Sequence, residues 1–252
     1  MLPESGSVLG VDVGWSLTQR SSAVCRLDWD AQSLRWTMLR FTGQSEARAA
    51  AIAEIVGAHQ LLAAAIDGSL RGDLTVIDRY RAAEKALAAK PISSRISQPG
   101  SSRSPVGRTL NHHANEFARL IIETGQLGPA SHDHAIHRLA LAEAFPTSYL
   151  GLLHPDPEKG LRTRRSDRYY EHAVMEGVLE QMVVHHLPGR RMHQSFADVT
   201  NHDDRAALIC ALTALGVARN DYVAVGDADG WIILPPRDFI AAWARPLVAG
   251  WN

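Results

Sequence analysis

The sequence has little cysteine: its 252 residues include two, Cys25 and Cys210. Two cysteines cannot build the disulfide framework of a small secreted scaffold, and they are too few for a cysteine-based structural zinc site. We therefore expect both to be small buried residues in a reducing compartment. A chain of this length also buries about 70–75% of its unfolded surface without covalent staples.

An excess of charge of one sign is also missing, as is any long apolar run. The 26 Lys and Arg residues nearly balance the 27 Asp and Glu residues, for a formal net charge of −1. This balance excludes a strongly basic nucleic-acid coat protein and a chain with a polyacidic tail. No apolar run approaches the roughly 18 residues of a membrane span, and residues 1–7 lack the basic segment of a secretory signal. The sequence predicts a cytoplasmic protein with no membrane partner.

The apolar pattern that is present predicts an α/β fold with a mixed sheet flanked by helices. Three strands separated by short gaps indicate an antiparallel meander near the N-terminus. The continuous apolar run at residues 61–66 is typical of a parallel strand that is covered on both faces. Strands are expected at residues 9–13, 23–29, 34–41, 61–66, 139–145, 222–226 and 231–234, and helices at residues 46–58, 79–89, 110–124, 169–187 and 203–215.

The chain organisation points to one unit. No linker separates two complete cores, so we predict a single domain over residues 1–252 with a helical insertion at residues 77–137. Two loops, the serine-rich residues 91–107 and the Pro- and Arg-rich residues 154–167, concentrate arginine in or beside them. Arginine pairs with phosphate oxygens, so these loops are candidate substrate contacts, with a solvated surface as the alternative. The candidate substrate-binding residues are Arg95, Arg103, Arg108, Arg162, Arg164 and Arg165.

Acidic residues stand near the ends of three expected strands: Asp12, Asp67 and Glu143. In an open α/β sheet, ligands bind beyond the carboxyl ends of parallel strands. If these strands are parallel neighbours, the three carboxylates converge at one edge. A further acid, Asp203 or Asp204, begins a helix whose apolar face must pack on the sheet.

Carboxylates gathered in this way repel one another and raise one another's pKa. A divalent cation removes the repulsion, and Mg²⁺ prefers oxygen ligands. Two such ions about 3.5–4 Å apart can activate a water and stabilise the leaving oxygen of a phosphodiester. The pattern therefore predicts a shared cation site, while a turn or helix-terminus role is the alternative for each acid taken singly.

These acids lie in segments that together resemble the domain-of-unknown-function family 429. The segments follow the family's order over nearly the whole chain, and the family is regarded as a set of predicted nucleases with a ribonuclease H-like fold. The similar segments are residues 8–14 (Val-Leu-Gly-Val-Asp-Val-Gly), 65–68 (Ala-Ile-Asp-Gly), 143–146 (Glu-Ala-Phe-Pro), 203–214 and 226–235.

The resemblance implies a ribonuclease H-like mixed sheet in which three antiparallel strands are joined by parallel strands. It implies that Asp12 and Asp67 are catalytic and bind Mg²⁺ or Mn²⁺, with Asp203 or its neighbour Asp204 in the helical role and Glu143 as an additional acid. A water activated by the metal would then hydrolyse DNA or RNA. Adjacent helix residues point about 100° apart, so the two aspartates need not reach the same ion. Whether the site binds one ion or two therefore stays open.

Two other functions stay open at this point. Residues 12–16, Asp-Val-Gly-Trp-Ser, resemble the first phosphate loop of actin-like phosphotransferases and ATPases, which share the same core. Those enzymes normally need two such cores and a second Gly-rich loop, and neither is evident in this sequence. A non-catalytic binding module that keeps the fold is the other alternative.

The histidines carry a weaker metal signal. A transition-metal site at His132, His134 and His137 is one interpretation, but surface residues are favoured because no cysteine supports it. His202 is expected to cap the helix that follows. Two adjacent pairs are expected at the surface or at the edge of the core: His112 with His113, and His185 with His186.

Overall fold

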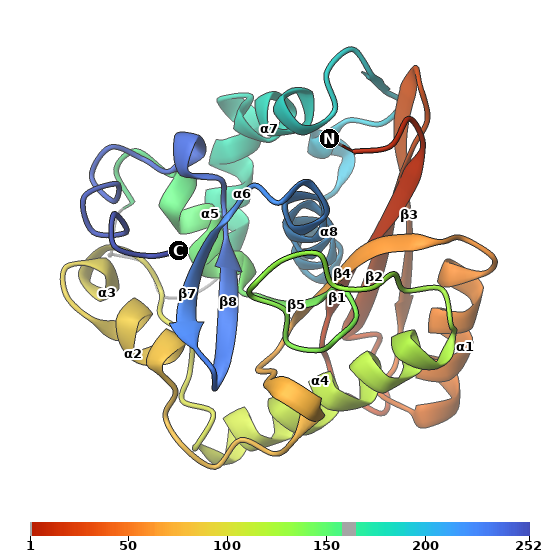
Figure 1. Ribbon diagram of the computed structural model, residues 1–252, viewed down its shortest axis with the longest axis horizontal. Coiled ribbons are helices and arrows are strands. Elements are labelled where there is room, and N and C mark those ends of the chain that lie inside the picture. The colour runs from red at the N-terminus through yellow and green to blue at the C-terminus, as the bar shows by residue number, and fades with distance from the viewer. Residues whose placement is uncertain (1, 158–164) are drawn as a thin grey trace.

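The computed structural model describes residues 2–157 and 165–252, and within them one mixed sheet carries helices on both faces (Figure 1). This arrangement confirms the α/β class and the mixed sheet. None of the helices in the described residues is long and apolar enough to cross a membrane. The strands are β1 (Gly6–Asp12), β2 (Ser22–Trp29), β3 (Ser33–Phe41), β4 (Leu61–Asp67), β5 (Leu141–Ala144), β6 (Arg191–Met192), β7 (Val223–Asp227) and β8 (Gly230–Leu234).

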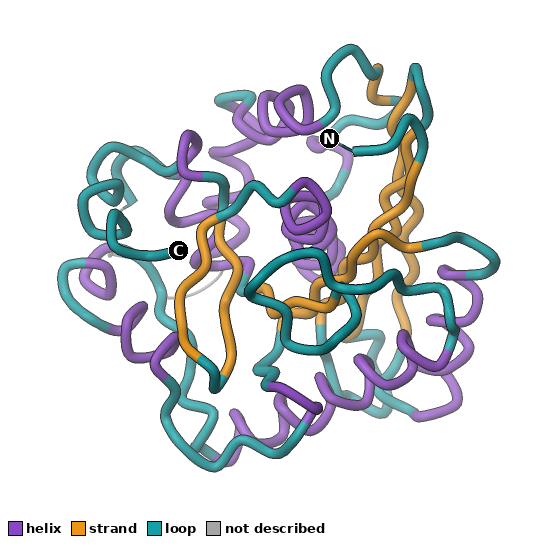
Figure 2. The backbone as a smooth tube through the Cα atoms, in the orientation of Figure 1, coloured by secondary structure: helices purple, strands orange, loops and turns teal. Residues whose placement is uncertain are grey.

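Helices connect the strands and cover the sheet (Figure 2). The α-helices are α1 (Ser45–Val56), α2 (Ala82–Ala88), α3 (Ile92–Arg95), α4 (Pro105–Glu123), α5 (Pro146–Leu153), α6 (Arg165–Met175), α7 (Val178–His186) and α8 (His202–Arg219). The described residues also form the short 3₁₀ helices η1 (Gly72–Leu74), η2 (Phe196–Asp198) and η3 (Arg237–Phe239).

The sheet runs in the order β6-β3-β2-β1-β4-β5-β8-β7. Strands β1, β2 and β3 form the antiparallel meander that the short gaps predict. Strand β4 is parallel to β1, and β5 is parallel to β4, so the carboxyl ends of all three lie at one edge. Strand β8 continues the sheet in parallel with β5, and β7 closes it as an antiparallel hairpin.

Helices α1 and α4 cover one face of the sheet, and α8 covers the other (Figure 1). Helix α8 is buried along almost its whole length, because it packs on β1, β2 and β4 while α5, α6 and α7 surround its remaining sides. A helix that is apolar all round belongs in such a position. The core therefore lies on both sides of the central strands.

Helix α8 meets β1 without an intervening side chain, at Gly10. A Cβ atom at this position would stand 2.1 Å from the backbone nitrogen of Ala211 and 2.2 Å from the carbonyl oxygen of Ala207. Only glycine leaves room for two backbones to approach so closely. Asp12 lies two residues further along the same face of β1, so this contact brings the first turn of α8 toward Asp12.

Two sequence expectations are wrong. The single helix expected over residues 169–187 is two helices, because Gly177 adopts a left-handed conformation (φ 66°) between α6 and α7. The serine-rich segment 91–107 is not all loop: it contains α3 and the first turn of α4. Ser104 caps α4 by accepting a hydrogen bond from the backbone N–H of Gly107, and Pro105 occupies the first helical position, where proline is favoured.

We predict that Gly10→Ala lowers the free energy of unfolding by at least about 1–3 kcal/mol, the usual cost of overpacking, because backbone atoms of α8 block the new methyl group. Denaturant unfolding measures this loss. Gly100→Ala is the matched control, since a Cβ there meets nothing within 4 Å. Equal stability of the two variants would show that α8 does not press on β1 at this point.

Candidate metal and catalytic site

The structure brings Asp12 and Asp67 together. Asp12 ends β1, Asp67 ends β4, and the register of the parallel ladder pairs the two residues directly. Residues in paired register share a face of the sheet, so both carboxylates lie on the face that α8 covers. Neither carboxylate accepts a hydrogen bond or an ion pair from another described residue.

Burial and neighbouring negative charges disfavour the ionised form of both carboxylates. Burial raises the pKa of Asp12 well above its ordinary value, and the charges of Asp67, Asp203 and Asp204 raise it further. Burial also raises the pKa of Asp67, from 3.8 to about 7; the charge of Glu143 adds to this effect and His202 opposes it. Acids from β1, β4 and α8 thus act on one another through space.

The first turn of α8 supplies two aspartates with different surroundings. The side chain of Asn201 caps the helix by accepting hydrogen bonds from the backbone N–H groups of Asp203 (2.9 Å) and Asp204 (3.3 Å), so the expectation that His202 is the cap is wrong. Asp204 lies 3.5 Å from Nε of Arg40. The Asp203 carboxylate has no such partner among the described residues, and its negative charge helps to raise the pKa of Asp12.

Glu143, the third predicted strand acid, does not join this group. Its register partner is Ile66, while Asp67 pairs with Ala144, so Glu143 projects from the opposite face of the sheet. Strand β5 is parallel to β4 as the prediction required, but the acid stands one residue before the position that faces α8. Glu143 is therefore removed from the candidate ligands.

Glu143 is instead neutralised in a buried ion pair. Arg81, which precedes α2 in the helical insertion, donates from Nη1 and Nη2 to the two carboxylate oxygens of Glu143, both at 2.7 Å. The same guanidinium donates to the carbonyl oxygen of Leu70 and to the carboxylate of Glu84. Arg81 is 1% exposed and Glu143 is 3% exposed, so this pair ties the insertion to β5.

A small cavity lies beside Asp12 and Asp67. Its volume is about 40 Å³, enough for two or three waters at about 10–15 Å³ each. Asp167, His202 and Arg205 also line it. A groove of about 670 Å³ adjoins the cavity and shares several lining residues with it. The shared residues are Thr147, Ser166, Asp167 and His202.

Sequence reasoning missed Asp167 and Arg205. The carboxylate of Asp167 accepts a hydrogen bond from Nδ1 of His202 (2.9 Å) and lies 3.3 Å from Nη1 of Arg205. A signal for Arg205 existed, because it follows His202 by three residues and shares its face of α8. Asp167 comes from a segment 35 residues before His202 in the chain, and no local sequence pattern predicts this contact.

The candidate substrate arginines are scattered. Arg165 lines the groove, where its Nη1 donates to a serine hydroxyl at 3.0 Å. Arg95 lies 3.6 Å from the carboxylate of Asp156 and over the ring of a tryptophan. Arg103 and Arg108 are exposed and are not among the groove-lining residues. Two further candidates, Arg162 and Arg164, lie outside the described residues.

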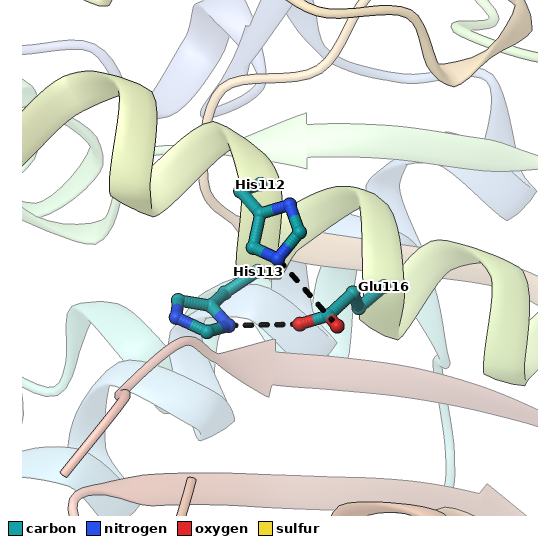
Figure 3. A group of neighbouring side chains, drawn as sticks. All are labelled: His112, His113 and Glu116. Atoms are coloured by element: carbon teal, nitrogen blue, oxygen red, sulfur yellow. Dashed lines mark hydrogen bonds and ion pairs between the residues drawn. The ribbon is translucent and has the colours of Figure 1, made fainter. Parts of the chain in front are cut away.

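The acids on the α8 face are not arranged as a compact set of metal ligands. Asp12, Asp67 and Asp203 are not among the described groups whose ligand atoms all lie within 4.8 Å of one another. Two described groups do meet that distance: His112, His113 and Glu116 (Figure 3), and His185, His186 and Asp221.

We predict that Asp67 lowers the stability of the metal-free protein as pH rises from about 4 to about 7, because folded Asp67 holds a proton that the unfolded chain releases. Asp67→Asn removes this loss. At about pH 8 with a chelator present, the variant should be about 1 kcal/mol or more above wild type in unfolding free energy, since each unit of pKa shift corresponds to about 1.4 kcal/mol. Urea unfolding at about pH 5 and about pH 8 measures the difference.

The matched control for this measurement is Asp78→Asn, because Asp78 is exposed. It should follow wild type at both pH values. A difference between wild type and Asp67→Asn that is the same at both pH values would contradict the raised pKa of Asp67.

We predict that Glu143→Gln destabilises the protein by about 1.5–3 kcal/mol, the usual worth of a hydrogen bond to a charged group, because it removes one of the two buried carboxylates that hold Arg81 and leaves Glu84 as the other. Thermal or denaturant unfolding provides the readout. A loss below about 1 kcal/mol, the range of an exposed ion pair, would show that the pair is not buried as described.

No protein-family model, curated protein or solved structure matches the chain. The resemblance to the domain-of-unknown-function family 429 therefore stays a prediction. A function is therefore inferred from the site itself: where its carboxylates lie, what surrounds them and which groove reaches them.

Proposed function

We propose that the chain is a divalent-metal-dependent nuclease, which hydrolyses phosphodiester bonds on a ribonuclease H-like scaffold. One observation carries this proposal: Asp12 and Asp67 stand side by side at the carboxyl ends of neighbouring parallel strands, and neither has an ion-pair partner among the described residues. An acid on β1, an acid on β4 and an acid on the last long helix support the ribonuclease H-like assignment. The antiparallel meander β1–β3 supports it as well.

The donor set fits Mg²⁺ or Mn²⁺. Asp12, Asp67 and Asp203 offer carboxylate oxygens, the ligands that these ions prefer, and none of the three is engaged by a described cation. Asp203 is preferred over Asp204 because Asp204 has Arg40 as a partner. When bound, the ion would neutralise the carboxylates and supply an activated water for attack on phosphorus.

The groove fits a short or structured stretch of nucleic acid. Its volume of about 670 Å³ lies within the range of about 300–1,000 Å³ that small-ligand pockets occupy. The N-terminus of α8 borders it through Asn201 and His202, and helix N-termini favour phosphate groups. Arg165 adds a positive charge at the wall. The net charge of −1 argues against tight, non-specific binding of long duplexes.

His202 is placed to move a proton. Asp167 accepts the hydrogen bond from its Nδ1, which orients the ring and leaves Nε2 for the groove. We assign His202 to proton transfer at the leaving oxygen, with Asp167 as its positioning residue. General acid catalysis by a positioned histidine contributes about 10²–10⁴-fold.

We predict that Asp12→Asn and Asp67→Asn each lower nuclease activity by at least about 100-fold, the usual scale for losing a group that stabilises transition-state charge. Cleavage of labelled DNA and RNA, single- and double-stranded, with Mn²⁺ or Mg²⁺ measures the effect. Asp203→Asn should be impaired more than Asp204→Asn. Asp78→Asn, at an exposed position, is the control and should match wild type.

Mn²⁺ binding provides a readout that needs no substrate. The ion should raise the melting temperature of wild type and fail to raise that of Asp67→Asn. Equal cleavage by wild type and Asp12→Asn would remove Asp12 from the active site. Stabilisation by ATP without cleavage of any nucleic acid would favour the actin-like alternative instead.

A further inference from the structure

A second group of metal-ligating side chains lies at the end of α8 opposite the carboxylates. Helix α7 ends with His185 and His186, and Asp221 follows α8 after Asn220, which adopts a left-handed conformation (φ 55°). The rise of an α-helix is about 1.5 Å per residue, so some 25 Å of α8 separate this group from the first-turn aspartates. The group is thus independent of the proposed nuclease site.

The distances suit a tetrahedral ion. Nε2 of His185 lies 2.6 Å from Oδ2 of Asp221, and Nδ1 of His186 lies 3.9 Å from the same oxygen. All three ligand atoms lie within 4.8 Å of one another. Zinc–ligand bonds of about 2.0–2.1 Å put tetrahedral ligands about 3.3 Å apart, and the two observed distances lie on either side of that value.

The burial of His186 is the independent indication of a ligand. Its side chain is withdrawn from solvent, with 2% of the residue exposed. Neither ring nitrogen has a hydrogen-bond partner in the part of the chain that the structure describes. Buried polar atoms are almost always paired, so an unpaired imidazole beside a second imidazole and a carboxylate needs an explanation. A metal ion bound at Nδ1 supplies one.

We propose that His185, His186 and Asp221 bind a transition-metal ion of the Zn²⁺ class. Two imidazoles and one carboxylate suit zinc and its neighbours, whereas Mg²⁺ prefers oxygen ligands alone. The side chains of His185 and Asp221 are 37% and 36% exposed, so the fourth coordination position faces solvent. The ion would join the end of α7 to the end of α8.

The histidines of α4 make a useful contrast (Figure 3). His112, His113 and Glu116 also lie within 4.8 Å of one another, but a buried cation already occupies their carboxylate. Arg48, 2% exposed, forms an ion pair with Glu116, and its Nη2 lies 3.1 Å from Nδ1 of His113. An ion would have to displace this guanidinium, so the α4 group serves as the matched control.

The test measures Zn²⁺ binding to untagged protein that has been stripped with a chelator. The background is Asp67→Asn, which removes the proposed nuclease ligand. Competition with a chromogenic chelator gives affinity and stoichiometry, and we expect one Zn²⁺ per chain. Asp221→Asn and His185→Gln should each weaken binding at least about tenfold, since even the loss of a group outside the ligand set costs about 10–100-fold. The double variant His112→Gln/His113→Gln should bind like its parent.

Co²⁺ provides a second readout, because a four-coordinate site gives visible bands that Asp221→Asn should lose. Replacement of the buried His186 is expected to disturb folding, so the decision rests on His185 and Asp221, with circular dichroism confirming that each variant is folded. No binding at millimolar Zn²⁺ would overturn the proposal. Unchanged affinity in Asp221→Asn or His185→Gln would do so too, as would loss of binding in the α4 double variant.

Discussion

Helix α8 rests backbone to backbone on β1 at Gly10, and the rest of the site depends on this contact. Any side chain at that position would hold the helix away from the sheet. Because the helix lies so close, its first turn places Asp203 within electrostatic reach of Asp12, while the ladder of β1 and β4 places Asp67 on the other side. Three segments far apart in the chain thus supply acids to one small volume.

This arrangement costs stability that other parts of the fold must supply. Carboxylates left without partners repel one another and resist ionisation, and a protein keeps such a group where the strain serves function. The compensation lies nearby: α8 is buried from Ala207 to Val217 between the sheet and three helices. An apolar layer of this extent tolerates a charged first turn. The same helix links the two proposed metal sites, one at each end.

Much of the fold follows from the sequence, because periodicity and short gaps report local structure directly. The antiparallel meander, the buried strand β4 and the placement of Asp12 and Asp67 at strand ends were all predictable from such patterns.

The face on which Glu143 lies was not predictable in this way. Side chains alternate along a strand, so an error of one residue in register moves an acid to the other face. The Asp167–His202 contact was out of reach for a different reason, since tertiary packing alone creates it. The break between α6 and α7 was predictable from Gly177, because glycine readily adopts the left-handed conformation that ends a helix. The helical spacing of apolar residues on both sides of Gly177 hid this signal.

The buried pair of Arg81 and Glu143 has a consequence for motion. A movement of the helical insertion away from the sheet would leave the Glu143 carboxylate without its counter-charge in a nonpolar interior, which costs far more than breaking a surface contact. The pair therefore holds the start of α2 against β5. The groove opens between the insertion, at Ser97 and Gln98, and the residues around the starts of α6 and α8, so room for a longer polymer requires movement on the α6 side.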